Sequence, residues 1–392
     1  MKKKIVILGS TGSIGKATLE IIKKDKKNFE IVLLTANNNI GELTKQIIEF
    51  NVLNVCINNT KHYETLKIKF RNKKVKIFNN HHNLNKIIKG KVDFTMSSIS
   101  GLSGLKPTLD AIKFSKRIAI ANKESIICGW NLIKKNLKKF STEFVPVDSE
   151  HFSIWSLIEN AKSQKIEEVI ITASGGPFLN LPLKNFKKIK PSMAIKHPNW
   201  TMGKKISIDS ATMMNKVFEV IEAIRIFEID IKKFKIIIHP KSYVHAIVKF
   251  SNGLTKILIH DTDMKIPIFN SIYLNENKSL KTKKLNYSLL NKLDFKICDS
   301  RRYPAIDILK NISNKSSLFE TILISANDEL VQLFLNGKIK FTDIFKLLYK
   351  IVNLKEFMKY KQISPKNFDQ INKLNTYVRL KTQSVSVLSP NV

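Results

Sequence analysis

Two acidic side chains in this sequence, Asp148 and Glu150, are close enough to meet one divalent cation, and a third acid is expected from elsewhere in the chain. Asp148 and Glu150 lie two residues apart in the segment PVDSEH, and Glu219 lies later, in the segment DSATMMNKVFE. Hard cations such as Mg²⁺ and Mn²⁺ favour two or three carboxylates, completed by water and substrate oxygens. The pair of acids alone is equally well explained by a helix N-terminus, where the helix dipole favours negative charge. The metal-site hypothesis therefore depends on the third acid.

The segment around Glu219 also offers groups that could bind a phosphate. We predict a helix from about 211 to 227. Asn215 and Glu219 are four residues apart and share one face of this helix, whereas Lys216 lies about 100° around it. A phosphate and a metal ion could therefore be bound from one helix. A solvated polar stripe is the alternative explanation for these three residues.

His197 and Trp200 lie in a long polar loop, in the segment HPNWTMGKKIS. Such a loop can close over a substrate and exclude water from the reaction. A packed turn explains the same residues equally well, so the loop alone does not distinguish a lid from a structural element.

A glycine-rich loop with the spacing G-x-x-G-x-x-G follows the first predicted strand. Gly9 permits a tight turn, Gly12 lets the backbone approach a pyrophosphate, and Gly15 lets helix and strand pack closely. The helix that we expect from about Lys16 would point its N–H groups at the anion. The loop therefore predicts a dinucleotide site, with a plain glycine turn before a helix as the alternative.

The end of the second predicted strand favours NADP over NAD. NAD-specific sites usually hold the adenine ribose with Asp or Glu at this position. Here the strand ends in LTANNN, so Asn37, Asn38 and Asn39 stand where the carboxylate would be. A carboxylate that would repel a 2′-phosphate is therefore missing, although an ordinary polar turn accounts for the same residues.

Polar residues or glycines directly follow three of the predicted strands. Lys123 and Glu124 come soon after one strand, Asp148 comes directly after the next, and Ser174 follows a third. In open α/β sheets, ligands collect beyond the carboxyl ends of the strands. These positions are therefore candidates for the substrate site.

The elements that must position these residues begin with a βαβ rhythm. Short apolar runs alternate with helical stretches, and the runs are continuously hydrophobic, which indicates strands that are covered on both faces. We therefore predict an α/β fold that starts with a Rossmann-like, doubly wound parallel sheet. The predicted strands are 4–8, 30–35, 52–57, 75–78, 92–96, 117–121 and 143–147.

The pattern changes near Asp148, where we predict a second, catalytic α/β domain, and again near Asp299, where it becomes helical. We expect the helix from about 211 to be capped by Asp209 or Ser210. The later strands are expected at 168–172, 234–239, 243–250 and 254–259, and the C-terminal helices at 305–310, 318–336 and 343–353. The expected domains are 1–147, 148–298 and 299–392.

Composition limits the class of protein. The 392 residues are enough for two or three domains, each with its own core. The three cysteines, Cys56, Cys128 and Cys298, have no C-x-x-C spacing, so we expect a reducing compartment and no zinc or disulfide framework. The basic start MKKK is followed by an apolar run that ends at Gly9, which indicates a strand and not a signal peptide. We expect a soluble, cytoplasmic protein.

The charge is strongly positive, with 67 basic against 32 acidic residues. The lysines are spread along the chain and rarely form the basic, aromatic-interleaved blocks that bind phosphate backbones. We therefore expect no specific nucleic-acid partner and no membrane partner. A drift toward Lys, Asn and Ile at exposed positions is our interpretation of the charge.

Six segments together resemble the 1-deoxy-D-xylulose 5-phosphate reductoisomerase family: GSTGSIG, ANKES, PVDSEH, SGGPF, HPNWTMGKKIS and DSATMMNK. They follow the family's order and spacing over essentially the whole chain. The resemblance implies a homodimer with NADPH-binding, catalytic and helical C-terminal domains. It also implies NADPH- and Mg²⁺- or Mn²⁺-dependent conversion of 1-deoxy-D-xylulose 5-phosphate to 2-C-methyl-D-erythritol 4-phosphate, in the non-mevalonate route to isoprenoid precursors.

The resemblance implies a role for residues in each motif. The implied NADPH contacts are Thr11, Gly12, Ser13, Ile14, Asn37, Asn38, Asn39, Asn122, Glu124 and Gly203. The implied metal ligands are Asp148, Glu150 and Glu219. The substrate phosphate would bind Ser174, Ser210, Asn215 and Lys216, and the carbonyl end would meet Lys123, Ser149 and Glu150. The catalytic group would comprise Lys123, Asp148, Glu150, His197 and Glu219, and His197 would contact the substrate from the closing loop with Trp200.

The sequence departs from the family pattern at two places. Asn37 and Asn38 stand where relatives often have glycine and a basic residue, and Val217 stands where glycine is common. Another reading is a simple NADP-dependent dehydrogenase of another phosphorylated substrate. Such an enzyme has no need of three acids, so metal dependence separates the two readings.

Overall fold

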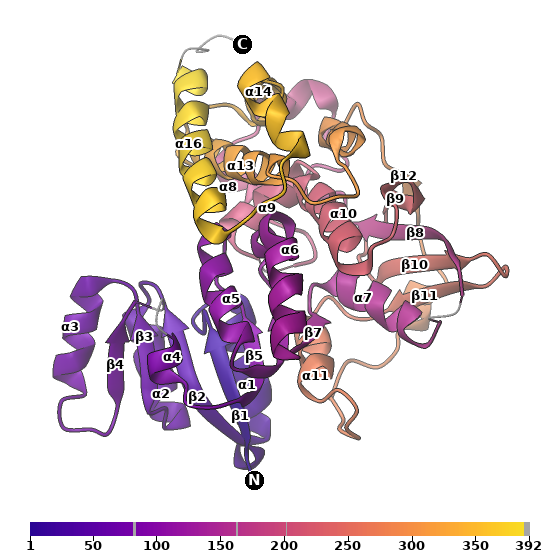
Figure 1. The fold of residues 1–392 in the computed structure, drawn as a ribbon. Helices are drawn as coiled ribbons and strands as arrows, with labels where there is room; N and C mark the ends of the chain where they lie inside the picture. The colour runs from indigo at the N-terminus through magenta and orange to yellow at the C-terminus, as the bar shows by residue number, and fades with distance from the viewer. Residues whose placement is uncertain (81–83, 162–163, 201, 388–392) are drawn as a thin grey trace. The chain divides into compact units, whose positions relative to one another are not determined.

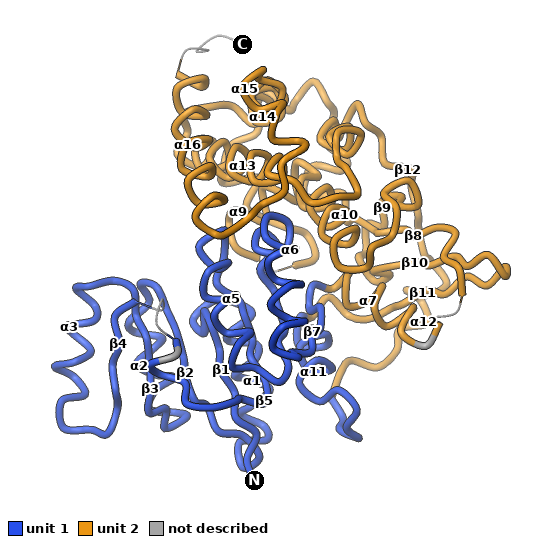
Figure 2. The backbone as a smooth tube through the Cα atoms, in the orientation of Figure 1, with its two compact units in different colours: residues 1–148, 264–280 blue, residues 149–263, 281–392 orange. Residues whose placement is uncertain are grey.

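The computed structural model describes residues 1–80, 84–161, 164–200 and 202–387. Thr201 of the predicted loop and the last five residues of the predicted C-terminal domain lie outside this description. The chain divides into two compact units, coloured separately in Figure 2: Met1–Asp148 with Met264–Leu280, and Ser149–Asp263 with Lys281–Val392. We call them unit 1 and unit 2. The predicted division into three domains stays a prediction.

Unit 1 contains the predicted doubly wound parallel sheet. Its strand order is β4-β3-β2-β1-β5-β6-β7. The order in which successive strands are added reverses between β1 and β5. Every pair of neighbouring strands in this sheet is parallel, as their continuous hydrophobicity predicted. The strands are β1 (Lys3–Leu8), β2 (Phe29–Ala36), β3 (Asn54–Ile57), β4 (Lys76–Asn79), β5 (Val92–Ser97), β6 (Ser115–Ile120) and β7 (Glu143–Pro146).

Helices follow most strands of this sheet, as Figure 1 shows. The α-helices of unit 1 are α1 (Ser13–Lys24), α2 (Ile40–Phe50), α3 (Thr60–Lys69), α4 (Leu84–Ile87), α5 (Leu105–Ile112), α6 (Lys123–Phe140) and α11 (Lys265–Ile272). Short 3₁₀ helices are η1 (Lys26–Asn28) and η3 (Leu102–Gly104). Helix α1 begins at Ser13, three residues before the predicted start.

The core of unit 1 includes a segment from much later in the chain. Ile268, Ile272 and Tyr273 are buried in the same hydrophobic cluster as the strands β1 and β2. The Tyr273 hydroxyl donates to Asp25 at 3.0 Å, and its ring meets Phe29 edge-on at 5.7 Å. Residues 264–280, which the sequence-based division groups with 148–298, therefore complete the core of the first sheet.

Unit 2 contains a mixed sheet with the order β11-β10-β8-β9-β12, in which β8 and β9 are parallel and the other pairs antiparallel. Its strands are β8 (Ile166–Ala173), β9 (Phe234–Ile238), β10 (Val244–Phe250), β11 (Thr255–Ile259) and the unpredicted β12 (Lys296–Ile297). Helices α7 (Ser149–Ile158) and α10 (Met214–Phe227) pack on this sheet and on each other.

The predicted helix 211–227 is α10, which begins three residues later than expected, at Met214. A separate helix that was not predicted, α9 (Lys204–Ala211), precedes it, and Met213 between the two helices has the left-handed conformation, φ 68°. The prediction that Asp209 or Ser210 caps the second helix was wrong, because both residues lie inside α9.

The rest of unit 2 is mainly helical, as predicted. The predicted helix 305–310 is a 3₁₀ helix, and α16 was not predicted. The α-helices are α8 (Pro191–Ala194), α12 (Tyr287–Leu290), α13 (Phe319–Leu335), α14 (Phe341–Val352), α15 (Lys355–Met358) and α16 (Phe368–Val387). The 3₁₀ helices are η4 (Glu159–Ala161), η5 (Leu183–Lys188), η6 (Ile231–Lys233), η7 (Pro304–Asn311) and η8 (Lys359–Gln362). Helix α13 is buried along most of its length and packs against α14 and α16.

Candidate active site

The three predicted acids offer carboxylate oxygens that lie within 4.8 Å of one another. Glu150 lies in the first turn of α7, and Glu219 lies on α10. Asp148 is the last residue of unit 1, but it is joined directly to Ser149, so the chain itself places it beside the start of α7. An acid-only set of this size suits a hard divalent cation. The sequence therefore grouped these residues correctly, and their role as ligands stays a prediction.

Lys216 joins two of these acids. Its ammonium lies 2.6 Å from Glu150 and 2.5 Å from Glu219. Burial by itself lowers the pKa of Lys216, but the two carboxylates more than offset this, and the net direction is a raised pKa. Lys216 is therefore a buried, charged ammonium, and the solvated stripe that was its alternative explanation is excluded.

Asn215 lies on the same helix face as Glu219, as its spacing predicted. The Asn215 amide donates to one carboxylate oxygen of Glu219. Glu219 is almost fully buried, so its second oxygen relies on Lys216 for compensation. The Ser149 hydroxyl donates in the same way to the Glu150 carboxylate. Both acids are thus oriented by neighbours before any ligand binds.

The strand ends of β6 and β7 meet, as their parallel pairing predicts. Lys123 begins α6 after β6, and its ammonium donates to Asp148, after β7, at 3.0 Å. Both side chains are largely buried, at 10% and 21% exposure. This ion pair therefore connects the ends of β6 and β7 within unit 1.

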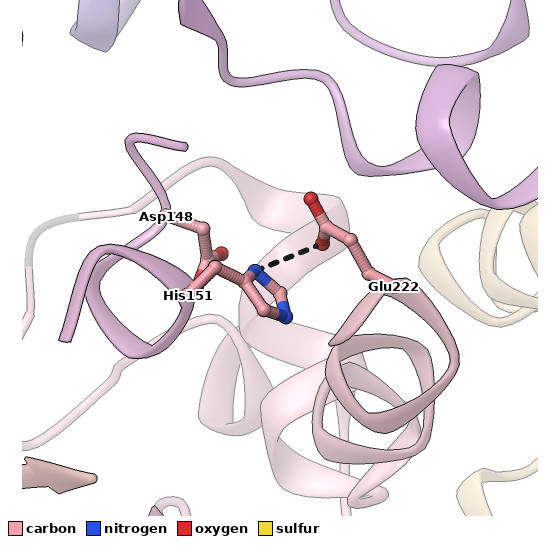
Figure 3. Close-up of side chains that lie close together, drawn as sticks. All are labelled: Asp148, His151 and Glu222. Atoms are coloured by element: carbon pink, nitrogen blue, oxygen red, sulfur yellow. Dashed lines mark ion pairs between the residues drawn. The ribbon is translucent and has the colours of Figure 1, made fainter. Parts of the chain in front are cut away.

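A buried histidine and glutamate that we did not predict lie beside this group. Figure 3 shows His151 of α7 and Glu222 of α10 with Asp148, and these three also form a cluster of possible ligands. His151 Nδ1 lies 3.4 Å from Glu222, and Nε2 lies 2.8 Å from the backbone carbonyl of Glu219. A carbonyl only accepts, so Nε2 carries a proton. His151 therefore links α7 to the backbone that carries Glu219.

The positions of Glu222 and His151 in the sequence could have indicated that they are buried near the acids. Glu222 lies three residues after Glu219, so it shares that face of α10, where the neighbouring residues are apolar. His151 directly follows Glu150. A buried acid and a histidine at such positions indicate a paired interaction, because an unpaired charge there would be costly.

His197 contacts Ser174, as their shared assignment to the substrate end implied. Ser174 Oγ lies 3.0 Å from His197 Nε2 and accepts from the backbone N–H of Gly176. The other ring nitrogen, Nδ1, accepts from the backbone N–H groups of Asn199 and Trp200. Nδ1 is therefore unprotonated, and Nε2–H donates to Ser174.

Burial and the charge of Lys216 lower the pKa of His197 from 6.5 to about 4. The imidazole is thus neutral near pH 7, in agreement with its hydrogen bonds. Trp200 lies edge-on to His245, with ring centroids 6.1 Å apart. His245 in turn stacks on His260 at 3.7 Å. The predicted lid residue Trp200 therefore lies in this structure against His245, one member of a stacked histidine pair that we did not predict.

Ser210 lies near the C-terminal end of α9, beside the loop that carries Ser174. A side-chain atom added to Gly176 would lie only 3.0 Å from the Ser210 carbonyl, and Gly176 has φ 66°. Glycine is therefore required there for both conformation and close approach. The loop after β8 and the end of α9 form one packed surface.

The glycine loop after β1 has the geometry that its spacing predicted. Gly9 has φ 83°, and a side-chain atom there would lie 2.7 Å from the Ser98 carbonyl, after β5. A side-chain atom at Gly15 would lie 2.5 Å from the Gly9 carbonyl. The loop thus lies between β1 and β5, where the strand order of the sheet reverses. Dinucleotides bind at this position in such folds.

The start of α1 suits an anion. Within the described part of this loop, no side chain caps the helix, whose N-cap residue is Gly12. Thr11, Ser13 and Ile14 are at least partly exposed around it. The backbone N–H groups of the first turn can therefore bind a pyrophosphate.

Other predicted cofactor residues have structural partners in this fold. Asn39 caps α2, and Asn38 accepts from Asn59 at 3.1 Å. Asn122 caps α6, and its amide also donates to the backbone carbonyl of Gly101 at 2.7 Å. These side chains hold the turns that follow β2 and β6. Asn37 is exposed, Glu124 lies in the first turn of α6, and Gly203 is the exposed N-cap of α9.

Sequence comparison places family models along nearly the whole chain. The model described as 1-deoxy-D-xylulose 5-phosphate reductoisomerase matches residues 5–129. The models of its C-terminal domain and of the DXP reductoisomerase C-terminal domain match residues 144–227 and 259–381. In the described part of the chain, moreover, no helix is both long and apolar enough to cross a bilayer.

Several proteins similar to this chain along nearly its whole length share one name. The 1-deoxy-D-xylulose 5-phosphate reductoisomerase of Pelagibacter ubique is 60% identical over 98% of this chain and 100% of its own length. That of Thermotoga maritima is 35% identical over 98% and 97%. The Zymomonas mobilis enzyme in complex with NADPH has a TM-score of 0.88 at 31% identity, covering 98% and 99%. A DOX-P reductoisomerase in complex with NADPH, fosmidomycin and magnesium has a TM-score of 0.91 at 30% identity, covering 98% of both chains.

Proposed function

This chain belongs to the 1-deoxy-D-xylulose 5-phosphate reductoisomerase family, and we propose that its carboxylate cluster carries that family's activity. The reaction is the NADPH- and divalent-metal-dependent conversion of 1-deoxy-D-xylulose 5-phosphate to 2-C-methyl-D-erythritol 4-phosphate. One observation carries the assignment of the site. The oxygens of Asp148, Glu150 and Glu219 lie within 4.8 Å of one another, beside the buried Lys216 ammonium.

The donor set fits a divalent cation of the Mg²⁺ or Mn²⁺ type. Three carboxylates at this spacing need positive charge, because buried anions are stable only when compensated. Asp148, Glu150 and Glu219 would hold the ion, and when bound it polarises carbonyl and hydroxyl oxygens of the substrate as a Lewis acid. Asn215 and Ser149 keep two of the carboxylates oriented, through their hydrogen bonds to Glu219 and Glu150.

The glycine loop fits NADPH. Its glycines permit close backbone approach at the reversal of the sheet, and the uncapped start of α1 offers N–H groups to the pyrophosphate. Bound NADPH supplies the hydride that reduces the rearranged, branched aldehyde. The cofactor would contact Thr11, Gly12, Ser13 and Ile14 of this loop and the three asparagines after β2. It would also contact Asn122, Glu124 and Gly203.

The phosphate of the substrate would bind at the packed surface of Ser174 and Ser210, with Asn215 and Lys216 on α10. Ser174 accepts from both Gly176 N–H and His197 Nε2–H, so its own hydroxyl proton remains to donate to a phosphate oxygen. Binding energy from the phosphate, which does not react, can hold the loop of His197 and Trp200 closed and exclude water.

Lys123 and the start of α7 would meet the reacting end of the substrate. Lys123 donates to Asp148, and Ser149 and Glu150 lie in the first turn of α7, directly after Asp148. An ammonium at this position stabilises negative charge that develops on a substrate oxygen. Lys123 is thus proposed to orient the substrate and Asp148 together.

We further propose a cytoplasmic homodimer. Large apolar side chains are exposed on the edge strand β12 and on α12, with Ile297 at 92% and Tyr287 at 71% exposure. Such side chains are typical of subunit contacts. The three cysteines are widely separated in the sequence, which fits a reducing compartment. Sedimentation equilibrium of the purified protein tests the dimer, and a monomer at all concentrations would contradict it.

One assay tests the proposed function. NADPH oxidation is measured with 1-deoxy-D-xylulose 5-phosphate, with and without Mg²⁺ or Mn²⁺. We expect turnover that exhaustive chelation abolishes and that added metal restores. Turnover that survives chelation would overturn the metal assignment and favour the simple dehydrogenase reading. Product identification by ³¹P and ¹³C NMR distinguishes the branched product from an unbranched one.

A further inference from the structure

Asp209 is a buried acid that the proposed chemistry does not use. It lies on α9 directly before Ser210 and is 1% exposed. One carboxylate oxygen accepts from the Asn327 amide at 2.8 Å, and the other lies 2.9 Å from the Lys205 ammonium, one turn earlier on α9. Both oxygens therefore have strong partners, and the side chain is held in one orientation.

The contacts of Asp209 continue into the C-terminal helices. Lys205 also lies 3.0 Å from Asp328 on α13, and the other oxygen of Asp328 lies 2.8 Å from Arg379 on α16. The side chains Asp209, Lys205, Asp328 and Arg379 thus alternate in charge from α9 to α13 to α16. We call them the Asp209 chain. Because all of them lie in unit 2, they connect the helix of Ser210 to the helical bundle.

Helix α9 needs such an anchor. It has only eight residues, and a helix of this length has little stability of its own in water. On one side the loop after β8 packs closely on the Ser210 backbone, through Gly176. The Asp209 chain supplies contacts from the bundle. Ser210 is therefore held between the loop that carries Ser174 and the C-terminal helices.

We infer that Asp209 is a positioning residue for the phosphate end of the substrate: it fixes the turn of α9 that presents Ser210. This inference rests on the proposed function, in which Ser210 binds the substrate phosphate. The C-terminal helices α13 and α16 are then part of the machinery that shapes the phosphate site. A displacement of about 1 Å in such a group can reduce catalysis about a hundredfold.

The test is the variant Asp209→Asn, which keeps the shape and loses the charge. We expect the KM for 1-deoxy-D-xylulose 5-phosphate to rise about tenfold, since a charge-assisted hydrogen bond is typically worth at least that factor. The kcat should change less than about threefold and the Kd for NADPH should not change, because the reacting end keeps its groups. The matched control is Glu329→Gln, which removes a different acid that pairs with the same Arg379. It should leave the KM unchanged.

A double-mutant cycle separates positioning from general stability. If Asp209 acts through Ser210, the variant Ser210→Ala should remove most of the effect of Asp209→Asn on the KM. Full additivity of the two changes would overturn the inference. An unchanged KM in folded Asp209→Asn, with only a lower melting temperature, would overturn it as well.

If Asp209→Asn fails to fold, Asp328→Asn decides the question. This variant interrupts the Asp209 chain between Lys205 and Arg379. It leaves the hydrogen bond between Asp209 and Asn327 intact. We expect a KM increase of about threefold that is again lost with Ser210→Ala. A wild-type KM in Asp328→Asn would then overturn the inference.

A binding measurement separates this inference from the proposed function. Inorganic phosphate should raise the melting temperature of the wild-type protein by ligand linkage, and less so in Asp209→Asn or Asp328→Asn. If the wild-type protein fails to turn over the substrate, the proposed function falls and this measurement alone decides. Equal shifts in wild type and variants, or no shift in wild type, would overturn the inference.

Discussion

The Lys216 ammonium lies 2.6 Å from the Glu150 carboxylate, so a buried ion pair joins helix α10 to helix α7. The same ammonium also forms an ion pair with Glu219, on its own helix. The two carboxylates raise the pKa of Lys216 although burial opposes them. A raised pKa means that the stabilising contribution is fully present below the ordinary lysine value and is lost only as the pH rises through the higher folded value.

The variant Lys216→Met should therefore destabilise the protein at pH 8, by about 3 kcal/mol, because it leaves buried carboxylates without their cation. Urea unfolding in the presence of a chelator measures the change. Lys249→Met is the control, since Lys249 pairs with Glu167 at the exposed surface, where ion pairs contribute little to stability. Equal effects of the two variants would contradict the importance of the buried pair.

The variant Glu219→Gln should lower turnover at least about a thousandfold, since it removes one ligand charge from the proposed metal site. The Kd for NADPH should stay within about twofold, because the glycine loop is untouched. Stopped-flow kinetics measures the turnover, and NADPH fluorescence titration measures the Kd. Glu228→Gln, at the exposed end of the same helix, should behave as wild type. A selective loss of NADPH affinity would place Glu219 in the wrong site.

The pKa of His197, lowered by burial and then by Lys216 from 6.5 to about 4, predicts a pH dependence. Between these values the unfolded chain binds a proton at His197 that the folded chain does not, so folding loses stability as the pH falls through this window. An NMR titration of the ring, assigned with His197→Gln, should show a midpoint near 4. Lys216→Met should move the midpoint upward. A wild-type midpoint at 6.5 would contradict the buried environment.

The variant Asn38→Asp should shift cofactor preference toward NADH. A carboxylate at the end of β2 would repel a 2′-phosphate and accept from a ribose hydroxyl, so we expect the Kd for NADPH to rise about tenfold and that for NADH to fall. Fluorescence titration without substrate measures both. Asn252→Asp adds the same charge in the exposed turn after β10 and should change neither value. Unchanged NADPH affinity in Asn38→Asp would move the 2′-phosphate elsewhere.

The strands of the first sheet were predictable because their physical signal is local. Most of them are short runs of residues buried on both faces, so their hydrophobicity is continuous, whereas the edge strand β4 is only partly buried. The meeting of Lys123 with Asp148 followed from the same rule, since parallel strand ends lie at one edge. The grouping of Glu219 with them needed the resemblance to a known family, because no local pattern connects residues so far apart.

The errors have tertiary causes. The chain is interrupted between α9 and α10 at Met213, which has a left-handed conformation. Methionine rarely adopts this conformation, so the sequence gives no local signal for the interruption. Helix α16 was missed because its buried face contains Thr382 and Ser386 beside Ile371 and Leu374, so its apolar pattern is weak. Strand β12 has two residues, too few for a period.

The return of residues 264–280 to the first unit has a consequence for synthesis. The core of the first sheet lacks Ile268, Ile272 and Tyr273 until the ribosome has made them, and by then residues 149–263 have already been translated. During synthesis, the core of unit 1 is therefore incomplete, and part of its apolar surface is exposed, while residues 149–263 of unit 2 are translated. A gene fragment that ends at Asp148 should accordingly yield an aggregation-prone product, whereas the full chain closes this face by itself.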